Sequence, residues 1–168
     1  MSDSANNAAQ VDVKTFWQTL GERAIGMTVV TASAQGEPAG FLGLSATHVT
    51  ADPPTMLVSI DRSTSALAAV LSSKHFAVNF LDADAGHVSD AFSGKSGLSG
   101  AQRFRTEQWT TLVTGAPIYT NALGAFDCQV EKVIDHGEIA IVIGAVVATR
   151  VGEGGNPLIF FRGKTSVG

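Results

Sequence analysis

The chain has 168 residues, 45% of them hydrophobic and 15% charged, which favours one well-buried domain and excludes an intrinsically disordered chain. Its formal net charge of −4 gives no general attraction to phosphate backbones or anionic lipid, so a nucleic-acid or membrane-surface partner is disfavoured. The single cysteine, Cys128, excludes an internal disulfide and a cluster of thiolate metal ligands.

A polar tail and an amphipathic helix come first in chain order. Residues 1–11 predict a disordered tail, and they show neither the cationic start nor the long apolar stretch of a signal peptide or membrane span. We therefore expect a cytoplasmic protein. Val13, Phe16, Trp17 and Leu20 then recur at helical spacing, which predicts a helix whose apolar stripe lies in the core.

Strands dominate the next segment. The run "GMTVVTASAQGEPAGFLGLSA" (26–46) has a β-branched stretch, a Gln-Gly-Glu-Pro turn and a second extended stretch, which predict a hairpin. "TMLVSI" (55–60) and "HFAVNFL" (75–81) predict two further strands. Between them, "STSALAAVLSS" (63–73) begins with hydroxyl residues and is rich in Ala and Leu, so we expect a short helix.

The second half of the chain predicts mainly β structure. "DADAGHVSDAF" (82–92) is typical of another short helix, and the glycine- and serine-rich residues 93–109 predict a mobile surface loop. From Pro117 onward, apolar runs alternate with turn sequences, which predicts a β meander. The economical architecture for residues 12–168 is one antiparallel barrel, closed or split, with short peripheral helices.

Common catalytic and metal-binding motifs are absent from the sequence. Two segments resemble the end of a phosphate-binding loop, but Leu158 and Ser89 occupy the position where that loop requires a glycine. The four histidines are far apart and predict no metal site. No Gly-x-Ser-x-Gly elbow occurs, and we expect Cys128 to be a buried, inert thiol.

The stretch from Gly40 to Leu67 is the strongest candidate for a binding site. Gly40 and Gly43 would allow close backbone approach, and Ser45 and Thr47 would share one face of a strand. The following "DRSTS" supplies a cation and three hydroxyls at the start of a helix, where unpaired N–H groups favour an anion such as a phosphate. The structural alternative is that these residues only cap the helix and form a solvated turn.

A series of motifs over the whole chain resembles the short-chain flavin reductase family, which has an FMN-binding split barrel and supplies reduced flavin to two-component monooxygenases. The resemblance runs from Phe16 to Gly163. It rests on "GMTVVTA", "GEPAGFLGLSATHVTADPPTMLVSIDRSTSAL", "HFAVNFL", "AFSG", "QRF" and "GAFDCQVEKVIDHGEIAIVIGAVV".

The resemblance implies a homodimeric NAD(P)H:flavin oxidoreductase that passes a hydride from NADH, less readily NADPH, to bound FMN or FAD, with no catalytic protein residue required. The reduced flavin would pass to a partner monooxygenase or another acceptor. The implied cofactor-binding residues lie in three segments. These are Gly43, Leu44, Ser45, Ala46 and Thr47 at the isoalloxazine and ribityl chain, Asp61, Arg62, Ser63, Thr64 and Ser65 at the phosphate, and Arg103 and Phe104 near the flavin or its dinucleotide tail.

The chain departs from the family pattern at several positions. Leu42 and Leu44 stand where relatives carry polar residues, so contacts there would come from the main chain. Gly137-Glu138-Ile139 replaces Gly-Asp-His, the usual aromatic is Thr165, and His136 is the one remaining candidate for the lost histidine. Two alternatives stay open: a flavoprotein that keeps its flavin and reduces a ferric chelate, corrinoid or quinone, and a non-catalytic flavin- or haem-binding module.

Overall fold

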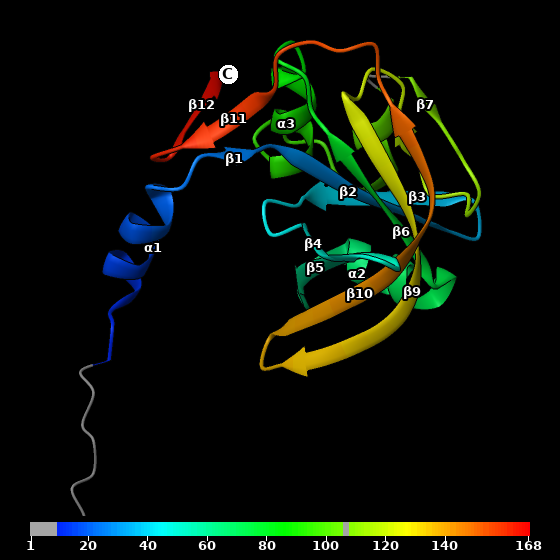
Figure 1. The fold of residues 1–168 in the computed structure, drawn as a ribbon, viewed down its shortest axis with the longest axis horizontal. Coiled ribbons are helices and arrows are strands. Elements are labelled where there is room, and N and C mark those ends of the chain that lie inside the picture. The colour runs from blue at the N-terminus through cyan, green and yellow to red at the C-terminus, as the bar shows by residue number, and fades with distance from the viewer. Residues whose placement is uncertain (1–9, 106–107) are drawn as a thin grey trace, which may run out of the picture.

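The computed structural model describes residues 10–105 and 108–168, and its main feature is a seven-stranded antiparallel sheet (Figure 1). The helices are α1 (Val13–Gly21), α2 (Ser65–Ser73), α3 (Gly86–Ser93) and the 3-10 helix η1 (Gly100–Phe104). The strands of the sheet are β2 (Thr28–Ala34), β3 (Glu37–Leu42), β4 (Thr47–Ala51), β5 (Pro54–Asp61), β6 (His75–Phe80), β9 (Gly124–His136) and β10 (Ile139–Val151). The remaining strands are β1 (Ile25–Gly26), β7 (Trp109–Thr110), β8 (Ile118–Tyr119), β11 (Leu158–Phe161) and β12 (Lys164–Val167). The predicted mainly β, antiparallel class with peripheral helices is confirmed. Of the predicted tail, residues 1–9 lie outside the described part of the chain.

The sheet is rolled into an open barrel because its two edge strands are consecutive in the chain. The strand order is β3-β2-β6-β9-β10-β5-β4, so β3 and β4 stand at opposite edges. A flat sheet of this width would separate them by about 29 Å. The connection from Leu42 to Thr47 reaches at most about 18 Å. The edges must therefore approach each other, and no ladder joins them in the described sheet.

The predicted first hairpin is confirmed, with a tighter turn than the sequence suggests. Ala34 pairs with Glu37, so only Gln35 and Gly36 form the loop, and both have positive φ (54° and 80°). Two positive φ values define the type I′ turn, whose twist matches that of the flanking strands. The predicted strands at 55–60 and 75–81, the helix at 63–73 and the C-terminal meander are also present.

Strand β2 is buried on both faces, which explains its continuous apolar run. Val30 and Ala32 belong to the main core inside the barrel, where α2 contributes Leu67 and Val70. Val29 faces a second cluster of buried residues under α3. The helices α2 and α3 therefore cover opposite faces of this strand, and an alternating polar pattern would leave one cluster incomplete.

Cys128 lies in the main core and is fully buried, as predicted for this thiol. Burial, with a smaller contribution from the neighbouring Asp127 carboxylate, raises its pKa to about 12. Asp127 is itself buried and accepts hydrogen bonds from the amides of Val113 and Thr114, at 2.7 and 2.8 Å. This carboxylate therefore fastens the segment before β8 to β9.

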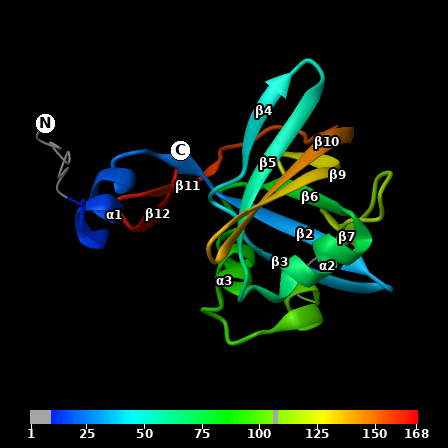
Figure 2. The same ribbon diagram turned by 90° about the horizontal axis from the view of Figure 1, so that it is seen from below.

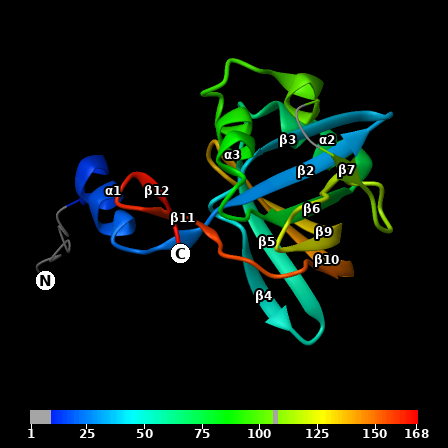
Figure 3. The same ribbon diagram turned by 90° about the horizontal axis from the view of Figure 1, so that it is seen from above.

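Helix α1 forms as predicted, but the prediction that its apolar stripe lies in the core is wrong. None of its residues is buried, and Phe16 and Trp17 are 52% and 62% exposed. The helix precedes β1, which pairs with β11 outside the seven-stranded sheet, so no sheet face lies beneath it. Figures 2 and 3 show α1 beside β11 and β12, away from the barrel. Arg162 ties it there through a 2.6 Å ion pair with Glu22.

In its described part, residues 93–105 and 108–109, the predicted surface loop at 93–109 is more ordered than its composition suggests. It contains η1, and Phe104 at the end of η1 is only 9% exposed because it packs against Phe92 of α3. The glycine and serine content of this loop therefore does not reveal that Phe104 anchors it to α3. Within the described residues, no helix is long and apolar enough to cross a membrane.

Two glycines of the β3 region make room for protein neighbours. A Cβ on Gly40 would lie 2.8 Å from the Phe92 ring and 2.9 Å from the Val30 carbonyl oxygen. A Cβ on Gly43 would lie 2.4 Å from Val30 Cγ2. The close approach predicted for these glycines is therefore made by β2 and α3, which set the shape of the barrel beside the open edge.

We predict that Gly40→Ala lowers the free energy of unfolding by about 1–3 kcal/mol, because the new methyl group overlaps a backbone carbonyl that cannot move alone. Urea denaturation measures this change. Gly86→Ala is the matched control, since no atom lies within 4 Å of its added Cβ and the position is helical. An unchanged stability in Gly40→Ala, or an equal loss in the control, would contradict the packing argument.

Candidate functional site

A cleft of about 460 Å³ lies between the end of the edge strand β3 and the strands β5 and β10. It is lined by residues from the end of β3, the following turn, β5, the turn before α2, the end of α3 and the start of β10, namely Phe41, Leu42, Gly43, Ser45, Ser59, Asp61, Thr64, Phe92, Ser93 and Ile139. Its size is that of a small-molecule site. Apolar side chains and a few polar groups share the lining, which suits a flat ring system with a polar tail.

The prediction that residues 43–47 form a strand is wrong, because Gly43–Ala46 is the turn between β3 and β4. The Gly43 amide donates to the Thr28 carbonyl at 2.8 Å, and the Ala46 amide donates back to Gly43 at 3.1 Å. Thr47 opens β4, so it shares no strand face with Ser45. The alternation of small and apolar residues imitates a strand, but this connection must bend to bring β4 back toward β3.

The Ser45 hydroxyl closes the turn against β5. It donates to the Ser59 carbonyl at 3.0 Å and accepts from the Ser59 amide at 3.1 Å. By contrast, the amides of Leu44 and Ser45 donate to no described residue. Main-chain N–H groups are therefore the polar groups that this turn leaves for a ligand.

The start of α2 offers a second set of unpaired donors beside the cleft. Thr64 is the N-cap residue, but its side chain makes no capping hydrogen bond. Within the described chain, the amides of Ser65 and Ala66 also donate to no acceptor. Unsatisfied amides at a helix N-terminus form a site for an anion.

The Asp61 carboxylate is held by its own turn. It accepts from the Ser63 hydroxyl at 2.6 Å and from the Ser63 amide at 2.8 Å. These two donors, the hydroxyl most strongly, hold the pKa of Asp61 below its ordinary value of 3.8. Asp61 lines the cleft, while Ser63 acts on Asp61 and is not among the lining residues.

Arg62 points to the β9–β10 turn. Its guanidinium forms an ion pair with Asp135 and donates through Nε to the Gly137 carbonyl at 3.3 Å. The side chain of the predicted phosphate cation thus pairs with a carboxylate of the protein. Arg62 is also not among the residues that line the cleft.

Arg103 and Phe104 support the cleft from behind. Arg103 donates to the carbonyls of Leu98 and Gly40, at 3.1 and 3.2 Å, and so fastens the loop after α3 to β3. Phe104 stacks edge-on against Phe92, with ring centroids 5.0 Å apart. Phe92 is the member of this pair that reaches the cleft.

Several lining residues were not foreseen from the sequence. Phe41, Ser59, Phe92 and Ser93 come from elements that were predicted, but which of their side chains face the cleft depends on how the sheet rolls. Ile139, noted only as a departure from the family pattern, also lines the cleft, and exposed His136 pairs with it in the β9–β10 ladder.

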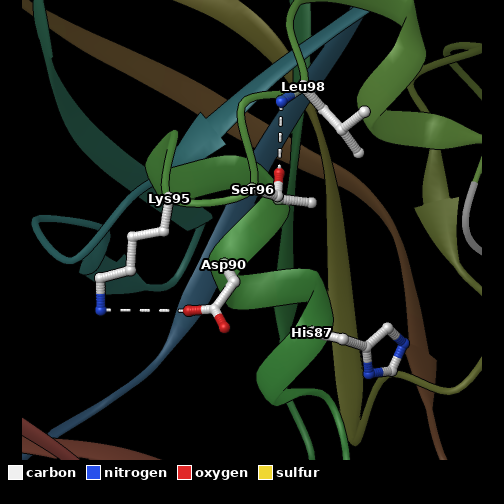
Figure 4. Close-up of a pocket in the computed structure, with 6 residues that line it drawn as sticks. His87, Asp90, Lys95, Ser96 and Leu98 are labelled. Atoms are coloured by element: carbon white, nitrogen blue, oxygen red, sulfur yellow. Dashed lines mark hydrogen bonds and ion pairs between the residues drawn. The ribbon is translucent and has the colours of Figure 1, made fainter.

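A second hollow, of about 320 Å³, lies on the outer side of α3 (Figure 4). Its charged groups offset each other, since Lys95 Nζ lies 3.9 Å from a carboxylate oxygen of Asp90. Ser96 accepts a hydrogen bond from the Leu98 amide at 3.4 Å. Among the described residues, no three His, Cys, Asp or Glu side chains group closely enough to hold a metal ion. The cleft at the barrel edge is therefore the stronger candidate.

The chain is similar to known proteins over nearly its whole length. The family model for the flavin reductase like domain matches residues 20–167. FMN reductase (NADH) RutF 2 of Rhizobium rhizogenes is 38% identical over 135 residues, which cover 80% of this chain and 77% of the relative. FMN reductase (NADH) RutF of Pantoea ananatis is 33% identical over 157 residues, covering 94% and 82%.

Among solved structures, nitrilotriacetate monooxygenase component B from Mycobacterium thermoresistibile superposes with a TM-score of 0.83 at 30% identity. The alignment covers 92% of this chain and 85% of that protein. The rolled sheet and its peripheral helices are therefore shared over nearly the whole chain.

We predict that Ser63→Ala raises the pKa of Asp61 part of the way toward 3.8, because the hydroxyl is lost while the backbone amide still donates. A depressed pKa means that the contact stabilises the turn above the ordinary pKa and that this contribution is lost as pH falls through the lowered value. An NMR titration of the Asp61 carboxyl carbon measures the change. Ser93→Ala is the control, since its hydroxyl donates to Asp90. An Asp61 pKa that is the same in both variants would contradict the assignment.

Proposed function

The chain belongs to the flavin reductase-like family, and on this premise we propose that it is an NADH:flavin oxidoreductase acting on FMN or FAD. The observation that carries the proposal is the cleft at the open barrel edge, which joins an apolar lining to two sets of unpaired main-chain donors. Hydride acceptance from NADH is the chemistry that a flavin supplies when bound. The protein then needs to bind and orient the reactants, and it needs no nucleophile of its own.

The residues divide naturally between the parts of a flavin. Phe41, Leu42 and Ile139 give an apolar surface for the ring, and the amides of Leu44 and Ser45 are donors for its polar edge. The phosphate would lie at the start of α2, against Thr64 and the hydroxyl and amide of Ser65. In this assignment, six of the predicted cofactor-binding residues do not contact the flavin and instead support the residues that do. They are Ala46, Thr47, Arg62, Ser63, Arg103 and Phe104.

We propose further that the reduced flavin leaves the protein and serves a monooxygenase or another acceptor. The cleft lies at the barrel edge and not inside the closed core, so a flavin there would remain accessible. The similarity to a monooxygenase component supports the same role. The absence of a marked arginine cluster in the sequence favours NADH over NADPH.

The exposed face of α1 is proposed to be covered by a second copy of the chain. Val13, Phe16 and Trp17 expose 72%, 52% and 62% of their surface on one short helix. Phe161 and Val167 of the adjoining hairpin are also exposed. An exposed apolar surface of this kind marks an interaction site. Because no residue of α1 is buried against its own barrel, we infer that two copies of the chain cover each other's α1 in a symmetric dimer.

The activity is tested by mixing the protein anaerobically with NADH and FMN or FAD and following the absorbance of the oxidised flavin at about 450 nm. We expect bleaching, and we expect the reduced flavin to separate from the protein on a sizing column. Bleaching of a flavin that stays bound would favour the flavoprotein alternative. A failure with both flavins and both nicotinamide nucleotides would exclude the proposed reaction.

A matched pair of variants locates the reaction. Ile139→Glu places a carboxylate in the apolar part of the cleft and should lower NADH oxidation by about tenfold or more, because the charge loses hydration when a flavin binds. Val151→Glu adds the same group at the far end of β10, where the side chain is 85% exposed, and should leave the rate unchanged.

The second copy is tested by sedimentation equilibrium, with a dimer expected at twice the chain mass of 17.4 kDa. Trp17→Glu should weaken association about 100-fold, because buried tryptophans contribute strongly to interfaces. Val113→Glu is the control, because Val113 is 70% exposed but lies in the segment before β8. A monomeric wild type, or a Trp17→Glu variant as dimeric as the control, would refute this interface.

A further inference from the structure

The tip of the β9–β10 hairpin and the turn before α2 are joined by one residue, Arg62. Arg62 follows β5, and its amide donates to the Glu138 carbonyl at 2.9 Å. Its Nε donates to the Gly137 carbonyl at 3.3 Å, and its Nη2 pairs with a carboxylate oxygen of Asp135. Three contacts from one residue thus reach both the backbone and the carboxylate of the tip.

On its β10 side the hairpin is paired with β5 from Ile139 onward, but its β9 side has little support near the tip. Strand β6 pairs with β9 only as far as Gln129, so the outer edge of β9 beyond that point has no neighbouring strand in the described sheet. Residues 131–138 are all exposed. In Figure 1 the ends of β9 and β10 reach beyond the rest of the barrel. Arg62 therefore provides the side-chain tie between this tip and the body of the protein.

The turn held by Arg62 leads directly to the candidate anion site. The Thr64 amide donates to the Asp61 carbonyl at 2.9 Å, and Thr64 occupies the N-cap position of α2. A shift of Arg62 would therefore move the backbone that carries Thr64 and the two unpaired amides of Ser65 and Ala66. The position of these donors relative to the cleft therefore depends on a contact with Asp135, which lies 73 residues away in the chain.

We propose that Asp135 is a positioning residue for the phosphate of the flavin. By pairing with Arg62, it holds the Asp61–Thr64 turn where the α2 amides receive an anion, and Arg62 itself does not bind the phosphate. This inference rests on the proposed flavin reductase function. It assigns a role in ligand binding to a residue that is 73% exposed in its side chain and not among the residues that line the cleft.

The test compares FMN with riboflavin, which has the same ring and ribityl chain but no phosphate. Flavin fluorescence titrations give the dissociation constants for the wild type, Asp135→Asn and Glu131→Gln. Glu131 is an exposed carboxylate on the same strand, so its variant has the same change in net charge. We expect Asp135→Asn to raise the FMN dissociation constant about fivefold and to leave riboflavin binding within about twofold. Glu131→Gln should change neither.

A double variant tests whether the two residues act as a unit. Arg62→Gln combined with Asp135→Asn should bind FMN no more weakly than the weaker of the two single variants, because the same contact is already lost. Thermal unfolding of each variant establishes that it is folded. Additive losses would overturn the coupling between the two residues.

Three results would overturn the proposal. Unchanged or tighter FMN binding in Asp135→Asn would mean that a released Arg62 is itself the phosphate ligand or that the pair has no role in binding. Equal weakening of FMN and riboflavin would show general damage to the cleft. A wild type that binds neither flavin would refute the proposed function together with this inference, whereas normal wild-type FMN binding with an unaffected variant would refute the inference alone.

Discussion

The structure depends on one geometric constraint, the short connection between the two edge strands of a seven-stranded sheet. Gly43–Ala46 joins β3 to β4, and these strands are the first and last in the sheet order. The sheet must therefore roll up, yet no ladder closes it in the described structure. An unclosed edge leaves main-chain groups without strand partners, and burying them without partners would be costly. The cleft lies at this edge because the roll brings apolar side chains and unpaired donors together there.

The polar side chains near the cleft serve mainly to fix its walls. Ser45 is bonded to Ser59 in both directions, and the Asp61 carboxylate is occupied by Ser63. Hydrogen-bonded side chains of this kind hold a loop in one geometry, which is what a rigid binding site requires. Apart from Thr64 and the Ser65 hydroxyl, the groups left for a ligand are backbone amides. Such a site constrains loop shape more than residue type, which is consistent with Leu42 and Leu44 at positions where the family resemblance led us to expect polar side chains.

The sequence predicted the elements well where their pattern depends on neighbours in the chain. The β2–β3 hairpin and α2 are local structures with strong turn and capping signals, and both are present. Prediction was weaker where distant contacts decide. The periodicity of α1 identified an apolar face but not what covers it, and α1 lies outside the barrel. Likewise, the local sequence led us to expect Arg62 at a phosphate. Its partner Asp135 lies 73 residues away in the chain, so the pattern around Arg62 gives no sign of their ion pair.

The lining of the cleft also bears on how the reaction would be controlled. Among its described lining residues, Asp61 is the ionisable one, and Ser63 holds its pKa below the ordinary carboxylate value. Asp61 therefore stays charged through the neutral range and has no proton to give there. Ile139 supplies an apolar surface at the position where a histidine was expected. Hydride transfer needs close, oriented rings more than it needs a protein acid, so turnover in such a cleft would depend on how the two reactants are held.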